Sequence, residues 1–170
     1  MTIATTAAIA AGVIALAAAG TQFLPRNVEV ERTAHVALSP EQVLEMAAST
    51  DGYQAFNPYA STDANLQIDP FGPAAGVGSG FAFKGKDGKG TQTVAAVTAD
   101  MVTYHIDMGA LGKPVQTIKA VPAEGGATVT WTVYSDMGVN PVFRVFGLFM
   151  DGMMGKVFEQ GLANMNETAV

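Results

Sequence analysis

The sequence predicts an α+β fold in which a strongly curved antiparallel sheet wraps around a long C-terminal helix, with a separate apolar helix at the N-terminus. Three observations lead to this prediction. Apolar residues recur at helical spacing from Asn140 to about Asn164, strand-like segments separated by turn residues fill most of positions 27–134, and positions 3–20 contain no charge. Short connections make the strands mostly antiparallel neighbours, and the apolar face of their sheet requires a helix to cover it.

The composition describes one acidic domain with an appendage. The chain has 170 residues, a net charge of −6 and a pI of 4.7. Nucleic acid is excluded as a partner because no basic stripe is present to displace counterions from phosphate. The only basic cluster, Lys84, Lys86 and Lys89, flanks a hairpin-turn signal. The absence of cysteine rules out disulfides and thiolate metal sites.

We expect residues 1–25 to form an uncleaved N-terminal membrane anchor. Positions 3–20 are close to the shortest length that spans a bilayer, and Pro25 ends the helix. Arg26 and Arg32 follow, so the positive-inside rule places the domain, residues 26–170, on the cytoplasmic side. One alternative is a cleaved signal peptide, which the small residues at 17–19 favour, and which would leave the domain secreted or periplasmic; a soluble helix is the other.

The domain begins with a strand and a capped helix. Apolar residues alternate with polar ones over 28–36, which predicts a half-buried strand. Arg32 shares the parity of the valines, so it needs a carboxylate or a ligand anion as partner unless its head reaches solvent. Ser39-Pro40-Glu41-Gln42 supplies a cap, a proline for the first turn and the reciprocal glutamine of a capping box, which predicts a helix from Ser39 to about Ser49.

Six further strands are predicted after an aromatic stretch that prolines interrupt. Glycine, proline and Asp-Gly turns separate them. Their expected bounds are Asn65–Asp69, Gly80–Lys84, Gln92–Thr98, Val102–Met108, Val115–Val121 and Thr128–Tyr134.

The C-terminal helix is predicted to begin at Asn140-Pro141, where Asn caps the free amides and Pro has its φ already set. Its apolar stripe consists of Phe, Met and Gly rather than Leu, Ile and Ala. Methionine is a flexible gap-filler, and each helical glycine costs about 1 kcal/mol relative to alanine. Such a stripe favours a lid over a hollow; the alternative is an ordinary core helix with a kink near Gly152.

This order of elements resembles the SRPBCC superfamily, the helix-grip fold of START lipid-transfer domains and polyketide cyclase/dehydrase-like proteins. The resemblance covers roughly Val28 to Met165. It rests on the first strand and capped helix, on Phe56-Asn57-Pro58-Tyr59, on Gly76-Val77-Gly78-Ser79-Gly80-Phe81, and on Phe158-Glu159-Gln160-Gly161-Leu162. Many members show a Trp-Ser-Pro-Trp-like segment where this chain has Phe56 and Tyr59. The resemblance implies a fold, and fold alone does not choose a function.

The predicted ligand-contacting residues follow from strand parity, the helix stripe and the aromatic segment. Both histidines, His35 and His105, fall on the outer face, and no catalytic motif occurs. The predicted ligand-contacting residues are Phe56 and Tyr59 of the aromatic segment, Phe81, Phe83, Tyr104, Ile106, Met108, Val129 and Trp131 on the concave face, Phe143, Phe146, Met150 and Met154 on the helix, and Arg32.

We therefore expect a membrane-tethered domain that binds a hydrophobic, lipid-like or aromatic molecule in an internal cavity. No cofactor, metal or catalytic residue is expected, and the oligomeric state is open. One alternative is a polyketide cyclase/dehydrase-like enzyme that uses Arg32, Tyr59 or Tyr104, since positioning alone accelerates ring closure. The other is a non-catalytic protein-interaction domain.

Overall fold

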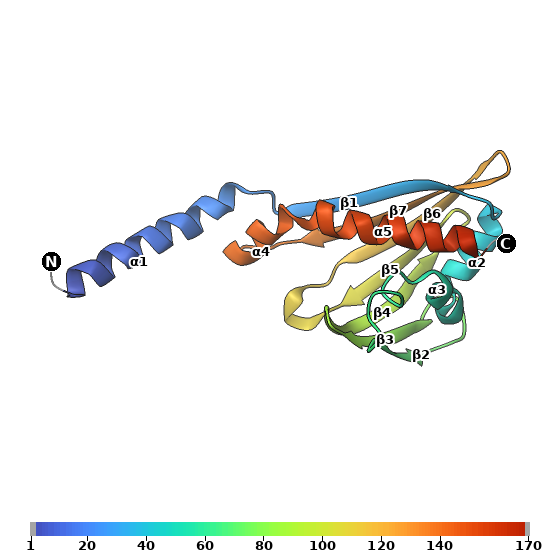
Figure 1. The fold of residues 1–170 in the computed structure, drawn as a ribbon, viewed down its shortest axis with the longest axis horizontal. Coiled ribbons are helices and arrows are strands. Elements are labelled where there is room, and N and C mark those ends of the chain that lie inside the picture. Colours follow the sequence, from blue (N-terminus) through green and yellow to red (C-terminus); the bar gives the residue numbers. More distant parts are fainter. Residues whose placement is uncertain (1–2, 169–170) are drawn as a thin grey trace.

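A computed structural model describes residues 3–168 and confirms the α+β architecture (Figure 1). The strands form one antiparallel sheet in the order β1-β7-β6-β5-β4-β3-β2. Their bounds are β1 Asn27–Val36, β2 Gln67–Phe71, β3 Gly80–Gly85, β4 Gly88–Val97, β5 Met101–Asp107, β6 Val115–Ala123 and β7 Gly126–Asp136. The helices are α1 Ile3–Gly20, α2 Pro40–Ala47, α3 Thr50–Phe56, α4 Pro141–Gly147 and α5 Met150–Glu167, with short 3-10 turns η1 Thr21–Phe23 and η2 Gly109–Leu111.

The sheet positions one long helix against its first and last strands. β1 pairs with β7 along its full length, and α5 runs beside this pair (Figure 1). A register shift between Val94 and Ala96 interrupts the β4–β5 ladder, and such bulges bend a strand and increase its twist. α2 packs against β6, and α3 lies against α5. The core therefore lies between the concave sheet and the three helices α2, α3 and α5.

The connection between β1 and β2 contains two helices. The predicted capping box is present, because the Ser39 side chain accepts from the Gln42 amide while the Gln42 side chain accepts from the Ser39 amide. α3 follows directly, with Ser49 as its cap, and was not predicted as a separate helix. It carries Tyr53 and Phe56 into the core.

The C-terminal helix is two helices, and the prediction of one continuous helix from Asn140 is wrong. α4 ends at Gly147, and α5 begins at Met150 after a turn at Leu148 and Phe149. A Cβ on Gly147 would lie 2.9 Å from a Val28 methyl group, so this residue packs close to β1. The break rotates α4 relative to α5. Phe146, which shares the predicted inner stripe, is consequently 46% exposed.

The prediction of a membrane anchor at the N-terminus is also wrong. Residues 3–20 do form the helix α1, but no helix in the described residues 3–168 is long and apolar enough to cross a bilayer. At 1.5 Å per residue, eighteen residues extend about 27 Å, short of a hydrocarbon core roughly 30 Å thick. Alanine, threonine and glycine also occupy most of its positions. The first two residues of the predicted anchor lie outside the described residues. The predicted cytoplasmic placement of the domain depended on this anchor and is therefore wrong as well.

Candidate functional site

The space between α5 and the sheet is filled by aromatic rings. Trp131 of β7 stacks on Phe158 of α5, with ring centroids 4.8 Å apart and planes inclined by 9°. Tyr53 and Phe56 of α3 meet the same indole edge to face. Trp131 also donates a hydrogen bond of 3.2 Å from Nε1 to the Gln116 side chain, so its one polar group is satisfied. The hollow that the Phe, Met and Gly stripe suggested is closed here.

A small internal cavity lies beside these rings, between α3 and strands β3 to β5. Its volume is about 10 Å³, which is room for about one water molecule. Its lining residues are Ala47, Ser49, Thr50, Tyr53, Ser79, Gly80, Phe81, Gln92, Val94 and Tyr104. Apolar and hydrogen-bonding groups therefore face each other across a small, buried space.

The polar groups around the cavity are held by local bonds. The Tyr104 hydroxyl donates to the Ala47 carbonyl at 2.6 Å, which fixes the end of α2 to β5. The Thr50 hydroxyl lies 3.1 Å from the Gly80 carbonyl, to which it donates, and 3.2 Å from the Ser79 hydroxyl. These bonds tie the first turn of α3 to β3.

Burial determines the protonation of the two phenols in the cavity wall. Desolvation raises the pKa of Tyr53, and a hydrogen bond with Gln92 offsets part of this effect. Burial likewise raises the pKa of Tyr104 well above its ordinary value. Both hydroxyls therefore remain protonated near neutral pH and can donate hydrogen bonds. Neither can serve as a general base there.

A second, larger pocket lies on the outside of the same wall. It has a volume of about 200 Å³ and is lined by Thr50, Asp51, Pro70, Phe71, Gly72, Pro73 and Ala74. Thr50 lines both spaces, so its side chain and the first turn of α3 separate the surface pocket from the buried cavity. The chain after β2 is fixed beside it, because the Gly76 amide donates to the Ala48 carbonyl at 2.8 Å.

The structure distributes the predicted ligand-contacting residues over five environments. Phe81 and Tyr104 line the cavity, and Phe56 and Trp131 belong to the adjoining aromatic cluster. Ile106, Val129 and Met150 are buried in the core, and Phe146 is exposed. The half-buried residues are Tyr59, Phe83, Met108, Phe143, Met154 and Arg32.

Sequence reasoning missed most of the cavity wall. Thr50 and Tyr53 belong to α3, a helix that was not predicted. Gln92 shares the inward parity of Val94, which is a signal that strand alternation could have used. Ser79 and Gly80 stand in a glycine-rich segment that was interpreted as a turn leading into a strand, without a role in a ligand site.

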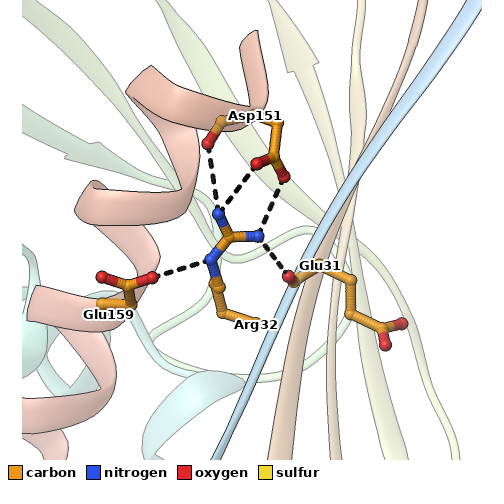
Figure 2. A network of polar contacts seen from close by, with 4 residues as sticks. All are labelled: Glu31, Arg32, Asp151 and Glu159. Carbon is orange, nitrogen blue, oxygen red and sulfur yellow. Dashed lines mark hydrogen bonds and ion pairs between the residues drawn. The ribbon is translucent and has the colours of Figure 1, made fainter.

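Arg32 lies apart from this cavity, and its guanidinium pairs with carboxylates (Figure 2). A carboxylate partner was one of the alternatives that the sequence left open for this residue. Its Nη1 and Nη2 donate to the two carboxylate oxygens of Asp151 at 2.9 and 3.1 Å, and its Nε donates to Glu159 at 2.8 Å. A Cβ on Gly155 would overlap Nη2, so only glycine leaves room for the guanidinium there. Hydrogen bonds from Arg32 lower the pKa of Asp151.

Among residues 3–168, no three histidine or acidic side chains are grouped closely enough to hold a metal ion. His35 and His105 are both exposed, as strand parity predicted.

The comparison with known families identifies the chain. Residues 27–170 match the model of a family described as polyketide cyclase / dehydrase and lipid transport. The chain belongs to this family. No curated protein matches its sequence.

Solved structures share the family fold at low identity. Norcoclaurine synthase from Thalictrum flavum has 15% identity and a TM-score of 0.62, with 84% of this chain and 86% of that chain covered. Ara h 8.0201 has 14% identity and a TM-score of 0.56, covering 82% and 97%. The di-domain ARO/CYC StfQ of the steffimycin biosynthetic pathway has 10% identity and a TM-score of 0.59, covering 84% and 50%. These likenesses show the helix-grip fold.

Proposed function

We propose that this domain binds a small hydrophobic molecule, aromatic or lipid-like, that carries one polar group. The observation that carries the proposal is the pair of spaces on either side of Thr50: a surface pocket of about 200 Å³ and a buried cavity of about 10 Å³. Membership of a family that includes lipid transport supports it. In this proposal the surface pocket is the entrance, and the buried cavity is the closed form of the ligand space.

Thr50, which lines both spaces, is held by neutral hydrogen bonds. Thr50 makes one neutral hydrogen bond to the Gly80 carbonyl and one contact with Ser79. Neutral hydrogen bonds of this kind contribute about 0.5–1.5 kcal/mol each to stability, because water replaces them on opening. A ligand that binds the open form better than the closed form shifts this equilibrium.

The chemistry of the wall defines the ligand. Phe81, Val94 and Ala47 provide apolar contacts, while Tyr53, Gln92 and Tyr104 provide hydrogen bonds. Since Tyr53 stays protonated, its hydroxyl suits a carbonyl or hydroxyl oxygen on the ligand, whereas the Tyr104 proton is donated to the Ala47 carbonyl. A ligand without any polar group leaves these groups unpaired and binds more weakly.

Titration of the full chain with 1-naphthol, naphthalene and oleate tests the proposal, with Trp131 fluorescence and calorimetry as readouts. We expect 1-naphthol to bind more tightly than naphthalene and to change the emission of Trp131, which lies next to Tyr53. Gln92→Leu should remove most of that preference. Ser135→Ala is the control, because Ser135 is also buried but lies outside the cavity wall. Absence of heat and of any emission change with all three probes would refute the proposal.

Thr50→Ala tests the entrance separately. The smaller side chain thins the wall, so 1-naphthol should associate faster in stopped-flow mixing. Thr130→Ala, whose hydroxyl lies 3.0 Å from that of Thr33 on the outer face, should leave the rate unchanged. If 1-naphthol associated at the same rate with Thr50→Ala and Thr130→Ala, the entrance would not lie at Thr50.

A cyclase or dehydrase is the second candidate, and the two buried phenols favour it. Their ring centroids are 5.6 Å apart, and Tyr53 can donate to the oxygen of an enolate that forms during ring closure, while Tyr104 donates to the Ala47 carbonyl. Two structural relatives are named as a synthase and as an ARO/CYC protein. An aryl ketoaldehyde that closes by aldol condensation would lose one water in mass spectrometry. Tyr53→Phe should slow that loss while leaving naphthalene binding intact if the enzyme hypothesis holds.

A further inference from the structure

A large apolar patch covers α4 and the first turn of α5. Its members are Phe23, Val139, Val142, Val145, Phe146, Leu148, Phe149 and Met153, all exposed. If a fully exposed phenylalanine offers about 200 Å², the three rings alone leave roughly 400 Å² uncovered. The other members bring the patch beyond the roughly 300–600 Å² that monomers usually expose, and close to the about 800 Å² per partner of a standard interface.

The patch is one surface because η1 is fixed to α4. The Gln22 side chain donates to the Val139 carbonyl at 3.0 Å, and Arg144 Nη1 donates to the Leu24 carbonyl. Arg144 is the only charged residue of α4, and it is buried with its guanidinium directed at the Leu24 and Gly138 carbonyls. The exposed face of α4 therefore carries no charge, which fits an uncharged partner.

The same chain contains a second uncharged surface that lacks cover. α1 has no charged residue, and its side chains Ile9, Val13, Ile14 and Leu16 are all exposed. α1 extends away from the domain (Figure 1). Gly20, between α1 and η1, has helical angles of φ −59° and ψ −32°, so the chain does not reverse there. α1 therefore points away from the α4 of its own chain.

We propose that the patch binds α1 of a second copy of this chain, in a reciprocal dimer in which each α1 covers the other copy's patch. The lengths allow this, since eighteen helical residues extend about 27 Å and residues 141–153, broken between α4 and α5, extend at most roughly 20 Å. Reciprocal exchange closes the assembly at two copies, because both surfaces of each chain are then used. The dimer buries two uncharged apolar surfaces that water would otherwise cover.

Three leucine-to-glutamate variants of the full chain test the dimer. Leu16→Glu alters α1, Leu148→Glu alters the patch, and Leu111→Glu in η2 is the control; these leucines are 76%, 55% and 59% exposed. Sedimentation equilibrium should show a wild-type dimer. Leu16→Glu and Leu148→Glu should each raise its dissociation constant at least tenfold, because a carboxylate would be buried without a partner. Leu111→Glu should not change it.

Mixing Leu16→Glu with Leu148→Glu distinguishes reciprocal exchange from other contacts. In the mixed dimer one interface carries both substitutions and the other carries none, so association should partly recover. Failure to recover, or a wild-type protein that remains monomeric, would overturn the proposal. A third result would also overturn it: the wild-type monomer floats with phosphatidylcholine vesicles, and both Leu16→Glu and Leu148→Glu abolish this flotation. The two apolar surfaces would then bind lipid rather than each other.

Discussion

The two halves of α5 are held against the sheet by different forces. The first half, Met150 to Gly155, is clamped by Arg32 through the largely exposed Asp151. The same guanidinium also pairs with the exposed Glu159, which stands in the second half. The second half, Phe158 to Met165, is buried along its inner face, and Phe158 stacks on Trp131. Each half contains a glycine that admits its partner: Gly155 accommodates a guanidinium and Gly161 an indole ring.

The difference shows how one helix can be held by one contact that is insensitive to salt and pH and by another that is sensitive to both. Apolar burial does not depend on salt or pH over the ordinary range, whereas exposed ion pairs are weakened by both. The second half should therefore account for most of the stability of the domain. The contribution of the first half to stability should fall with added salt and at low pH.

Trp131→Ala is expected to have the largest effect. Removing the ring deletes the contact with Phe158 and leaves a cavity between α3 and α5. Replacement of a buried aromatic residue by alanine typically costs about 3–5 kcal/mol. Urea denaturation followed by circular dichroism measures the loss. A loss below about 1 kcal/mol would mean that the second half of α5 is not the main anchor.

Gly161→Ala is expected to destabilise less. The new Cβ would overlap a Trp131 ring carbon, in a stack that has no room to move. Overpacking costs about 1–3 kcal/mol, against a helix-propensity gain of about 1 kcal/mol. Gly152→Ala is the matched control on the same helix, because nothing lies within 4 Å of the position that its methyl group would take. That control should stabilise the fold by up to about 1 kcal/mol. Equal shifts for the two variants in urea would contradict the comparison.

Gly155→Ala should change salt dependence rather than core packing. The methyl group would displace the end of the Arg32 side chain, which can rotate into solvent but then loses Asp151 and Glu159. We expect thermal melts of the wild type to lose stability on addition of salt, and this loss to be smaller in Gly155→Ala. If both proteins respond alike, the clamp contributes nothing measurable.

Asp151→Asn gives the smallest expected effect, and it depends on pH. The pKa of Asp151 is depressed by Arg32, so the ion pair stabilises the fold above the ordinary carboxyl pKa of 3.8 and loses that contribution as pH falls through the depressed value. Melting temperatures of wild type and variant should therefore differ near neutral pH and converge as pH falls below the depressed pKa of Asp151. Asp69→Asn, an exposed acid outside the ion pairs described for residues 3–168, should match the wild type throughout.

The sequence predicted the sheet because strand parity and turn residues are local signals. The alternation over β1 places Arg32 and the valines on the inner side as expected, and the capping box of α2 forms as its residues require. The boundary between α4 and α5 gave no such signal. Leu148 and Phe149 suit a helix, and the apolar spacing continues across them, so only the tight packing of Gly147 on Val28 reveals the break.

The closed cavity could not be predicted for a different reason. Parity shows which side of a strand faces inward but not how much of the enclosed space other segments fill. Here Tyr53 and Phe56 fill it, and they belong to a stretch whose aromatic and proline content indicated a loop. Whether the predicted ligand-contacting residues bind anything stays a prediction that the titrations address.

The pairing of β1 with β7 has a consequence for the order of events during synthesis. Val36 lies opposite Ala127 and Asn27 opposite Asp136, so the first strand to leave the ribosome has a partner that is made much later. At about 5–20 residues per second, β1 waits roughly 5–20 s with its backbone unpaired. Glu29 and Glu31 occupy alternate positions of that strand and are exposed in the finished fold. Charges at such positions oppose pairing with other nascent chains, so they protect the strand until β7 arrives.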